Sequence, residues 1–211
     1  MREYHKIETV YERDTAGTKK LIEGQFRNPA VEFLSDNVWE WTEKIDGTNI
    51  RIHWDGHQVS FGGRTDNAQI PAPLVNRLNE LFGGETNAQL FEQKFGETEI
   101  TLYGEGFGAK IQKVGVMYKS DGVDFILFDA RVGDLWLTRD SVEDIGKAFG
   151  LRVVPVVLFG DIETAVKYVK NNPMSTIGTA PMEGLVGRPM VEMRDRRGSR
   201  IIVKLKVRDF E

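Results

Sequence analysis

The chain has 211 residues, 40 % of them hydrophobic, and a formal charge of -4, enough length for one domain with a substantial core. It contains no cysteine, which excludes disulfides, thiolate nucleophiles, iron–sulfur clusters and cysteine-ligated zinc, and which is typical of a reducing compartment. The longest apolar run, 153–159, is far shorter than the roughly 18 residues of a membrane helix, and the first thirty residues are charged throughout. We therefore expect a cytoplasmic protein with no membrane span and no signal peptide.

Charge is distributed unevenly along the chain. Between Arg188 and Arg208, eight basic residues accompany two acidic ones, so this segment carries +6 and the other 190 residues carry -10. Such asymmetry favours a local anion-binding site over a uniformly basic nucleic-acid binder. A solvated, arginine-rich hairpin has the same composition, and charge alone favours that simpler interpretation.

The first half of the chain predicts mostly strands. Residues 38–45 form the first of them. Apolar side chains alternate with polar ones from Ile50 to Trp54, and Asp55-Gly56 then turns the chain into a partner strand that begins at Val59. The next expected elements are a helix over 74–82, where apolar residues have helical spacing, and a strand over 99–103.

The second half mixes hairpins with helices. Asp140 and Glu143 form a possible capping box for one helix, and Gly150 lies just past its end. The predicted elements are a hairpin of 124–131 with 135–138, helices over 142–149 and 162–169, a loop over 171–181, and strands over 153–159, 184–187 and 201–207. Because strands dominate and hairpins recur, we expect an α+β fold with antiparallel sheets flanked by short helices, in a single domain over 1–211.

A lysine lies where one predicted strand ends and a tight turn begins, in the string Glu43-Lys44-Ile45-Asp46-Gly47-Thr48-Asn49. This position suits covalent chemistry. An ammonium cannot attack, so neighbouring cations or a metal must favour the neutral amine. The short string alone favours an ordinary surface turn.

Five further segments follow Lys44 in a defined order. They are 61–65 with Arg64, 102–106 with Glu105, 125–129 with Phe125, 182–186 with Glu183, and 203–207 with Lys204 and Lys206. In this order the segments resemble the covalent nucleotidyltransferase superfamily of ATP-dependent ligases and capping enzymes, over about residues 40–207. Thr48-Asn49 resembles the RNA ligases of the repair and editing type, since DNA ligases and capping enzymes usually carry arginine in place of Asn49.

The resemblance implies a nucleotidyltransferase (ATP-grasp-like) ligase core and a role for each segment. Lys44 would attack the α-phosphorus of ATP and form lysyl–AMP. Lys204 and Lys206, which a strand places on one face, would hold the α-phosphate. The remaining implied roles are nucleotide binding by Asn49, phosphate contact by Arg64, ribose binding by Glu105, adenine stacking by Phe125 with Phe128 and Asp129 structural, and support of Mg²⁺ or Mn²⁺ by Glu183 through its water shell.

The activity implied is that of an RNA ligase, which adenylates an RNA 5′-phosphate and seals it to a 3′-hydroxyl. The sequence departs from the usual motifs of the family at two positions. The basic residue that follows the segment 182–186 is Arg188, and Asp46 stands where many editing-type ligases carry histidine. Two alternatives stay open: a nucleotide- or RNA-end-binding module that does not seal, and a capping-type guanylyltransferase or DNA ligase.

Related ligases append an OB-fold or helical domain after the last box, whereas this chain ends five residues beyond Lys206. We therefore expect the catalytic domain alone, of the phage type and acting in the host cytoplasm if a phage encodes it. We also expect weak, salt-sensitive RNA affinity, and an accessory RNA-binding partner is possible.

Overall fold

The computed structural model describes residues 1–211 and divides into two compact units, each with its own core. Unit 1 comprises Met1–His5 and Asp46–Val154, and unit 2 comprises Lys6–Ile45 and Pro155–Glu211. The single domain expected from the sequence thus contains two separately packed bodies. The chain passes from one to the other immediately after Ile45, one residue beyond Lys44.

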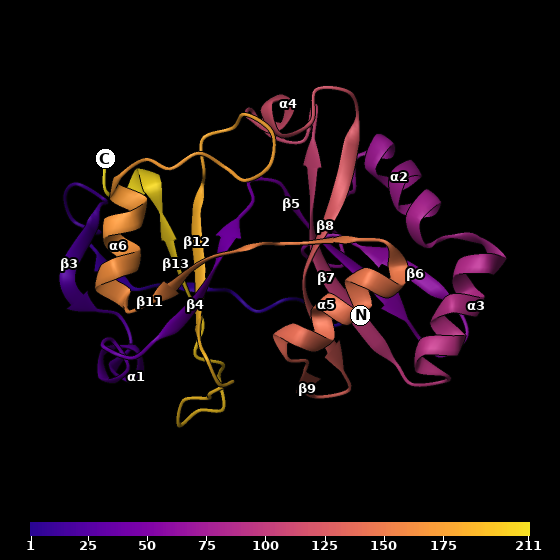
Figure 1. Ribbon diagram of the computed structural model, residues 1–211, viewed down its shortest axis with the longest axis horizontal. Helices are drawn as coiled ribbons and strands as arrows, with labels where there is room; N and C mark the ends of the chain where they lie inside the picture. The colour runs from indigo at the N-terminus through magenta and orange to yellow at the C-terminus, as the bar shows by residue number, and fades with distance from the viewer. The chain divides into compact units, whose positions relative to one another are not determined.

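Unit 1 is built on a six-stranded sheet with the order β10-β8-β7-β5-β6, and β9 pairs with β8 (Figure 1). All neighbours are antiparallel except β10 and β8. The strands are β5 (Thr48–Trp54), β6 (Val59–Gly62), β7 (Ile100–Gly108), β8 (Val123–Val132), β9 (Leu135–Trp136) and β10 (Arg152–Val153). The helices are α2 (Ala72–Phe82), α3 (Gly84–Phe95), α4 (Gly115–Tyr118) and α5 (Arg139–Phe149).

The core of unit 1 lies on one face of this sheet, under α2, α3 and α5. Ile50, Ile52 and Trp54 alternate along β5 and point into this core, which explains the alternation in the sequence. Trp54 stacks on Phe91 of α3 at 5.5 Å between ring centroids. The alternate, polar residues of β5, which include Asn49, are thereby directed to the other face of the sheet.

Unit 2 is built on a five-stranded sheet with the order β1-β13-β12-β4-β11, in which only β1 and β13 run parallel. A separate two-stranded ribbon pairs β2 with β3. The strands are β1 (Glu8–Thr9), β2 (Tyr11–Arg13), β3 (Leu21–Phe26), β4 (Trp39–Lys44), β11 (Val156–Gly160), β12 (Gly184–Pro189) and β13 (Val203–Lys206). The helical segments are α1 (Pro29–Phe33), α6 (Ile162–Lys170) and a terminal 3₁₀ turn, Val207–Asp209.

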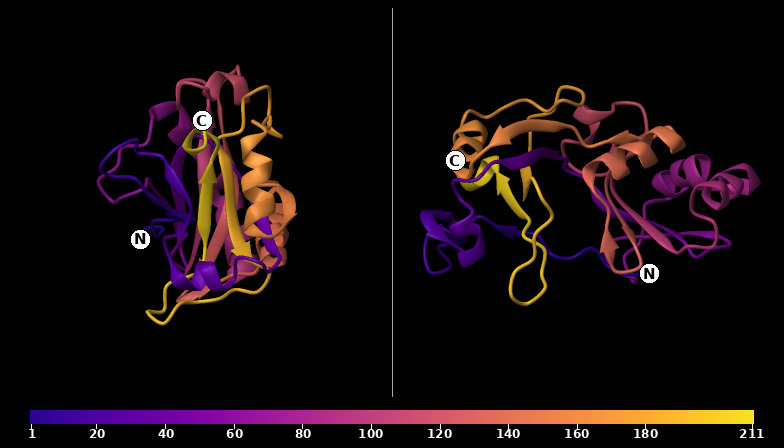
Figure 2. Two further views of the ribbon diagram at one scale, coloured as in Figure 1. Left: turned by 90° about the vertical axis from the view of Figure 1, so that its left-hand side faces the viewer. Right: turned by 60° about the horizontal axis from the view of Figure 1, so that its bottom comes forward.

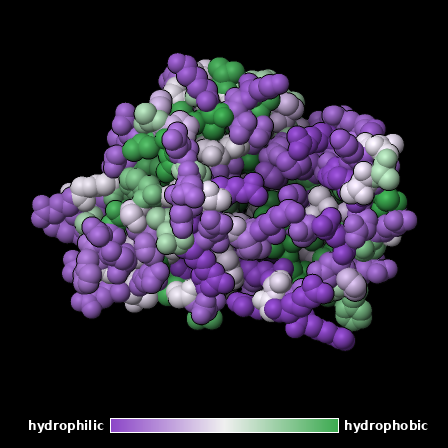
Figure 3. Space-filling model, turned by 180° about the vertical axis from the view of Figure 1, so that it is seen from behind, coloured by the Kyte–Doolittle hydropathy of each residue, from purple (hydrophilic) through white to green (hydrophobic).

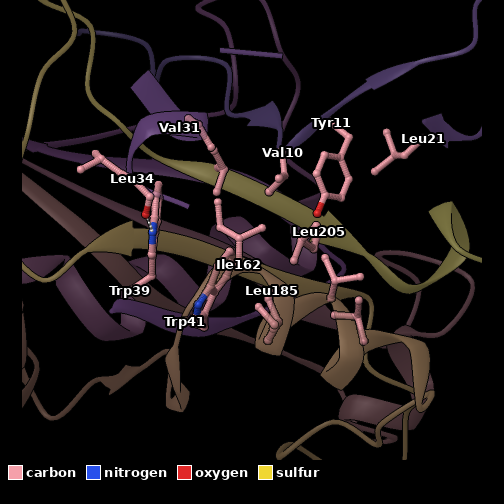
Figure 4. Packing of buried hydrophobic residues seen from close by; sticks show 14 of the residues in the cluster. Val10, Tyr11, Leu21, Val31, Leu34, Trp39, Trp41, Ile162, Leu185 and Leu205 are labelled. Carbon is pink, nitrogen blue, oxygen red and sulfur yellow. Dashed lines mark hydrogen bonds between the residues drawn. The ribbon is translucent and has the colours of Figure 1, made fainter. Parts of the chain in front are cut away.

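The core of unit 2 occupies the sheet face that α6 covers (Figures 2 and 4). Trp39, Trp41, Leu185 and Leu205 point into it from three strands and are each fully buried. A Cβ on Gly187 would lie 2.3 Å from the Trp41 ring, so this position of β12 accepts only glycine without repacking. With apolar side chains on this face, the alternate residues of β4 and β13, including both strand-end lysines, lie on the other.

The structure confirms the α+β class and the three predicted helices, which are α2, α5 and α6. The strand predicted over 153–159 is wrong as one element, because Pro155 divides it into β10 and β11, which belong to different sheets. Proline has no N–H to donate to a ladder, so it ends the pairing of β10. The sequence analysis did not predict α1, α3, α4 or the three N-terminal strands; α3, for example, buries only Phe91.

The surface carries its apolar residues singly or in small groups. On the face seen in Figure 3, hydrophobic residues are scattered among hydrophilic ones. The exposed large apolar side chains come from many elements, with Phe33, Leu135 and Phe159 among the most exposed. None of the helices has the length and apolar character that a membrane crossing requires.

Candidate active site

Three residues of unit 2 that the sequence singled out meet at adjoining strand ends. β12 lies between β4 and β13, and Gly184 is in register with Lys44 on one side and Lys206 on the other. The carboxylate of Glu183 lies 2.7 Å from Lys44 Nζ through Oε2 and 2.5 Å from Lys206 Nζ through Oε1. One carboxylate is therefore shared by two lysines, and their side chains are only 14–24 % exposed.

Gly184 allows the strands to come together at this point. A Cβ there would lie 2.0 Å from the carbonyl oxygen of Leu205 and 2.8 Å from the Cα of Lys206. Any side chain would therefore push β13 away from β12. The glycine after Glu183 thus brings the Lys206 side chain within reach of the Glu183 carboxylate.

Lys204 lies on the same face of β13 as Lys206, two residues earlier, and pairs in register with Val186. Burial lowers the pKa of the Lys204 ammonium, and the positive charges of Lys206 and Lys44 lower it further. For Glu183, burial acts to raise the pKa, but Lys44 and Lys206 outweigh it and hold the pKa below its ordinary value. Three cations around one carboxylate leave this face with an excess of positive charge, which a bound anion would neutralise.

The lowered pKa of Lys204 gives an expected result for Lys204→Met, which keeps a long apolar stem and removes the charge. Below the folded-state pKa the native protein carries a poorly solvated cation, so the variant should melt higher, by no more than about 2 °C because solvent screens this partly exposed group. The gain should shrink as pH rises through the folded-state pKa and vanish above the ordinary lysine value. The resemblance implies that ATP binds here, and on that expectation ATP should bind more weakly to the variant.

Calorimetry across a pH series, with ATP titrations, measures both effects. Lys147→Met, on an exposed lysine paired with Asp144, is the control and should show neither. A Lys204→Met protein that melts lower than wild type at neutral pH would contradict this account of the charge.

Glu43 takes part in the architecture around Lys44, and the sequence analysis did not find it. Its side chain points to the opposite face of β4 from Lys44 and is 1 % exposed. The carboxylate accepts hydrogen bonds from the hydroxyls of Ser175 and Thr176 and, at 2.9 Å, from the backbone N–H of Thr176. Glu43 thereby fixes the loop that precedes β12 to the strand that ends in Lys44. The only sequence signal was an acidic residue inside a buried strand, and its partners lie more than 130 residues away.

In unit 1, Asn49 and Glu105 occupy paired positions on β5 and β7. Both lie on the face away from the apolar core, and the side-chain oxygen of Asn49 is buried without a hydrogen-bond partner. Such an atom is an open acceptor for a donor group on a ligand. The turn that leads into β5 is held by Gln112 and Tyr118, which hydrogen-bond to the backbone of Gly47 and Asp46.

The glycines on either side of Glu105 serve packing of the core. A Cβ on Gly104 would lie 2.2 Å from the ring of Phe125, and one on Gly106 would lie 2.3 Å from Leu74. The side of each glycine where a Cβ would stand faces the core of unit 1, so the missing side chains allow close packing there.

The expected role of Phe125 also needs correction. Phe125 is 2 % exposed, lies in the core of unit 1 and meets Phe82 edge to face at 5.5 Å, so its ring is not presented on the Asn49 and Glu105 face. Phe128 was expected to be structural, but a β-bulge turns it and Asp129 away from that core. Its half-buried ring contacts Tyr4, whose hydroxyl donates to Asp129 at 2.8 Å. Of the two rings, only Phe128 shares the side of Glu105.

Arg64 is exposed in the segment that follows β6. Its surroundings are fixed by Arg51, a fully buried residue that donates to the carbonyl oxygens of Gly63 at 2.7 Å and Met1 at 2.9 Å. Arg51 also pairs with Asp66 at 2.9 Å. The loop that carries Arg64 is therefore held on both sides of it, while its own side chain can reach a ligand.

The residues around Glu183 fit a divalent cation only in a limited way. No group of three or more metal-ligating side chains is present, and Glu183 is the carboxylate beside the lysines. One carboxylate suits a cation that keeps most of its water, as Mg²⁺ does, and does not form a protein cage. The expectation that Glu183 acts on a cation through the water shell stays a prediction.

Comparison with protein-family models matches residues 37–206 to the RNA ligase family. No curated protein matches the sequence. Among solved structures, an RNA ligase from Naegleria gruberi with PPi has a TM-score of 0.62 at 21 % identity, over 84 % of this chain and 52 % of that one. A variant of the same ligase with ATP and Mn has a TM-score of 0.65 at 18 % identity, over 95 % of this chain and 61 % of that one.

At these identities the structural likeness shows the fold, and the chain spans between about half and three fifths of the length of these structures. The family match, in contrast, covers most of the chain and runs from just before the Lys44 strand to Lys206. It includes the expected site residues on both sheets, from Lys44 to Lys206. The chain belongs to the RNA ligase family.

Proposed function

We propose that this chain is the adenylating core of an ATP-dependent RNA ligase and that Lys44 forms a covalent bond with AMP. The observation that carries this proposal is the carboxylate of Glu183 shared between Lys44 and Lys206, with Lys204 on the same face. A nucleophilic lysine for phosphorus needs cations close by that can take up phosphate charge. The junction of β4, β12 and β13 supplies the lysine, Lys44, and the neighbouring cations, Lys204 and Lys206.

In the proposed first step, Lys44 Nζ attacks the α-phosphorus of ATP as a neutral amine. A nitrogen–phosphorus bond forms, the bond from the α-phosphorus to the bridging oxygen breaks, and pyrophosphate leaves with that electron pair while the amine proton passes to solvent. Lys204 and Lys206 stabilise the negative charge on the α-phosphate. Because the pKa of Glu183 is lowered, its carboxylate is a poor proton acceptor and serves as a counter-charge for the lysines.

Before the attack, the Lys44 ammonium must leave its ion pair with Glu183 and lose one proton to solvent, which gives the neutral amine. An arriving phosphate competes for both lysines, which frees the carboxylate. A divalent cation, Mg²⁺ or Mn²⁺, would be held by Glu183 through water and would supply charge neutralisation at the phosphates. The Naegleria gruberi ligase of the same fold has been solved with ATP and Mn, which supports this choice of ligands.

For the rest of the nucleotide we propose roles on the open face of the unit 1 sheet. Glu105 accepts a ribose hydroxyl, and Asn49, whose side-chain oxygen has no partner, contributes a further polar contact. Phe128 replaces Phe125 as the ring available to the adenine, because Phe125 is in the core. Arg64 contacts a phosphate of the nucleotide or the RNA.

The later steps follow from the same chemistry. The AMP moves from Lys44 to an RNA 5′-phosphate, and a 3′-hydroxyl then attacks that phosphate and releases AMP, so that the two RNA ends are joined. The proposal includes a separate RNA-binding partner that supplies additional affinity for the RNA. Activity in the cytoplasm is likewise proposed.

Mass spectrometry of the intact protein tests the proposal. Protein stripped of any bound adenylate is incubated with magnesium and either ATP or GTP, and a mass increase of one AMP is expected with ATP alone. A guanylate would indicate a capping enzyme, and no adduct with either nucleotide would leave only a binding module. Sealing of nicked RNA, compared with nicked DNA, then tests the substrate.

A further inference from the structure

The segment between β12 and β13, residues 190–200, forms a hairpin that projects beyond the end of β12 (Figures 1 and 2). We propose that this arginine hairpin binds the phosphate backbone of duplex RNA at a distance from the ends being joined, through Arg196 and Arg197 at its tip. The inference rests on the proposed function, because it concerns how the same RNA is held.

The tip of the arginine hairpin is a built turn. The backbones of Arg194 and Arg200 form an antiparallel β-bridge, and the backbone N–H of Asp195 donates to the carbonyl oxygen of Ser199 at 2.8 Å. The Asp195 carboxylate accepts the N–H groups of Arg197 at 2.8 Å and Ser199 at 2.9 Å. These bonds close the turn at both ends, so the two central arginines are presented from a defined backbone.

The acidic residues of the hairpin do not neutralise those arginines. Glu192 is held by the guanidinium of Arg200, at 2.6 Å from Nε and 3.0 Å from Nη2. Asp195 is engaged by backbone N–H groups of its own turn. Arg196 and Arg197 are exposed, and no carboxylate pairs with either. Two adjacent guanidiniums without internal partners favour a polyanion, since each can form a forked contact with a phosphate.

The position of the hairpin in the sheet determines which phosphates it can reach. β12 begins at Gly184, next to Glu183, and its six residues end at Pro189. At about 3.3 Å per residue, the hairpin starts roughly 17 Å from the Lys44 cluster. Because β12 and β13 carry both the cluster and the hairpin, the spacing is fixed within unit 2. A contact there falls on backbone phosphates several nucleotides from the RNA ends, where sequence is not read.

Salt-dependent RNA binding tests this with the full chain and nicked RNA duplexes. Arg196→Ala with Arg197→Ala is compared with Lys147→Ala with Lys167→Ala, which removes the same charge from exposed faces of α5 and α6. We expect the double variant Arg196→Ala with Arg197→Ala to bind long-armed duplexes about tenfold more weakly. The slope of its log affinity against log salt should be smaller by about 1.8. Duplexes with arms shorter than half a helical turn should bind both variants alike.

A second pair, Arg196→Lys with Arg197→Lys, keeps the charge and should retain the wild-type slope. The proposal is overturned if Arg196→Ala with Arg197→Ala binds RNA with the same affinity and salt slope as the Lys147 and Lys167 control. It is also overturned if Arg196→Lys with Arg197→Lys loses the wild-type salt slope. Lysyl–AMP formation is measured in parallel and does not involve RNA. If wild-type protein forms no adenylate but its RNA binding still depends on Arg196 and Arg197, the proposed function fails and this inference stands.

Discussion

The Lys44→Met protein should form no covalent AMP adduct. The variant removes the only atom that would bond to phosphorus but keeps the length of the side chain, and loss of a nucleophile lowers rates by on the order of 10⁴-fold or more. Strand joining from RNA and ATP should be lost to the same extent. Quantitative intact-mass analysis and a nicked-RNA sealing assay measure the two effects.

A pre-adenylated RNA separates the role of Lys44 as nucleophile from a structural one. This substrate bypasses the step at Lys44, so Lys44→Met should still seal it, within about tenfold of the wild-type rate, since the phosphate-binding lysines are intact. Lys44→Arg is the control for charge: it preserves a cation beside Glu183 but cannot form the adduct. If Lys44→Met forms an adenylate elsewhere, or if it loses the sealing of pre-adenylated RNA as fully as the first step, the assignment is contradicted.

The sequence placed both lysines and the glutamate of the shared-carboxylate cluster at the ends of short strands, and the structure has them there. Lys44, Glu183 and Lys206 each border a short apolar strand, and local alternation is enough to define such strands. Three antiparallel neighbours then bring these positions together by register. The family resemblance supplied the roles, and the structure added the shared carboxylate, which no pattern along the chain expresses.

Other parts depended on contacts between distant segments. The spacing of Phe125 and Phe128 correctly placed them on opposite faces, but spacing cannot tell which face the helices of unit 1 cover, and it is Phe125 that lies in the core. The structural role of Glu43 was missed for the same reason, since the partners of its buried carboxylate lie far along the chain. The division at Pro155 was visible in the sequence as a strand breaker, yet only the two separate sheets show its consequence.

Glu183→Gln should weaken both stability and catalysis, because Glu183 is the counter-charge for two half-buried lysines. Glutamine keeps the shape but leaves Lys44, Lys204 and Lys206 to repel one another. Removing one partner of a buried pair costs about 3–5 kcal/mol, and the partial exposure of this one lowers the expectation to about 1–3 kcal/mol. With the role proposed for Glu183, at the outer shell of a divalent cation, adenylation should fall by about 10–100-fold.

The loss of stability in Glu183→Gln should depend on pH in one direction. The pKa of Glu183 in the folded protein is below the ordinary value, so its stabilising effect is fully present above the unfolded-state pKa and is lost as pH falls through the folded-state pKa. The stability difference between wild type and Glu183→Gln should therefore be constant near neutrality and narrow in acid. Denaturant unfolding at a series of pH values measures it.

A double variant distinguishes charge balance from loss of a specific contact. Glu183→Gln with Lys206→Met removes one charge of each sign, so it should recover part of the lost stability while adenylation stays as low as in the single variant. Recovery of both would mean that the lysines only repel each other and that Glu183 has no further role. Recovery of neither would mean that repulsion among the lysines does not cause the loss of stability, which would contradict the account of Glu183 as their counter-charge.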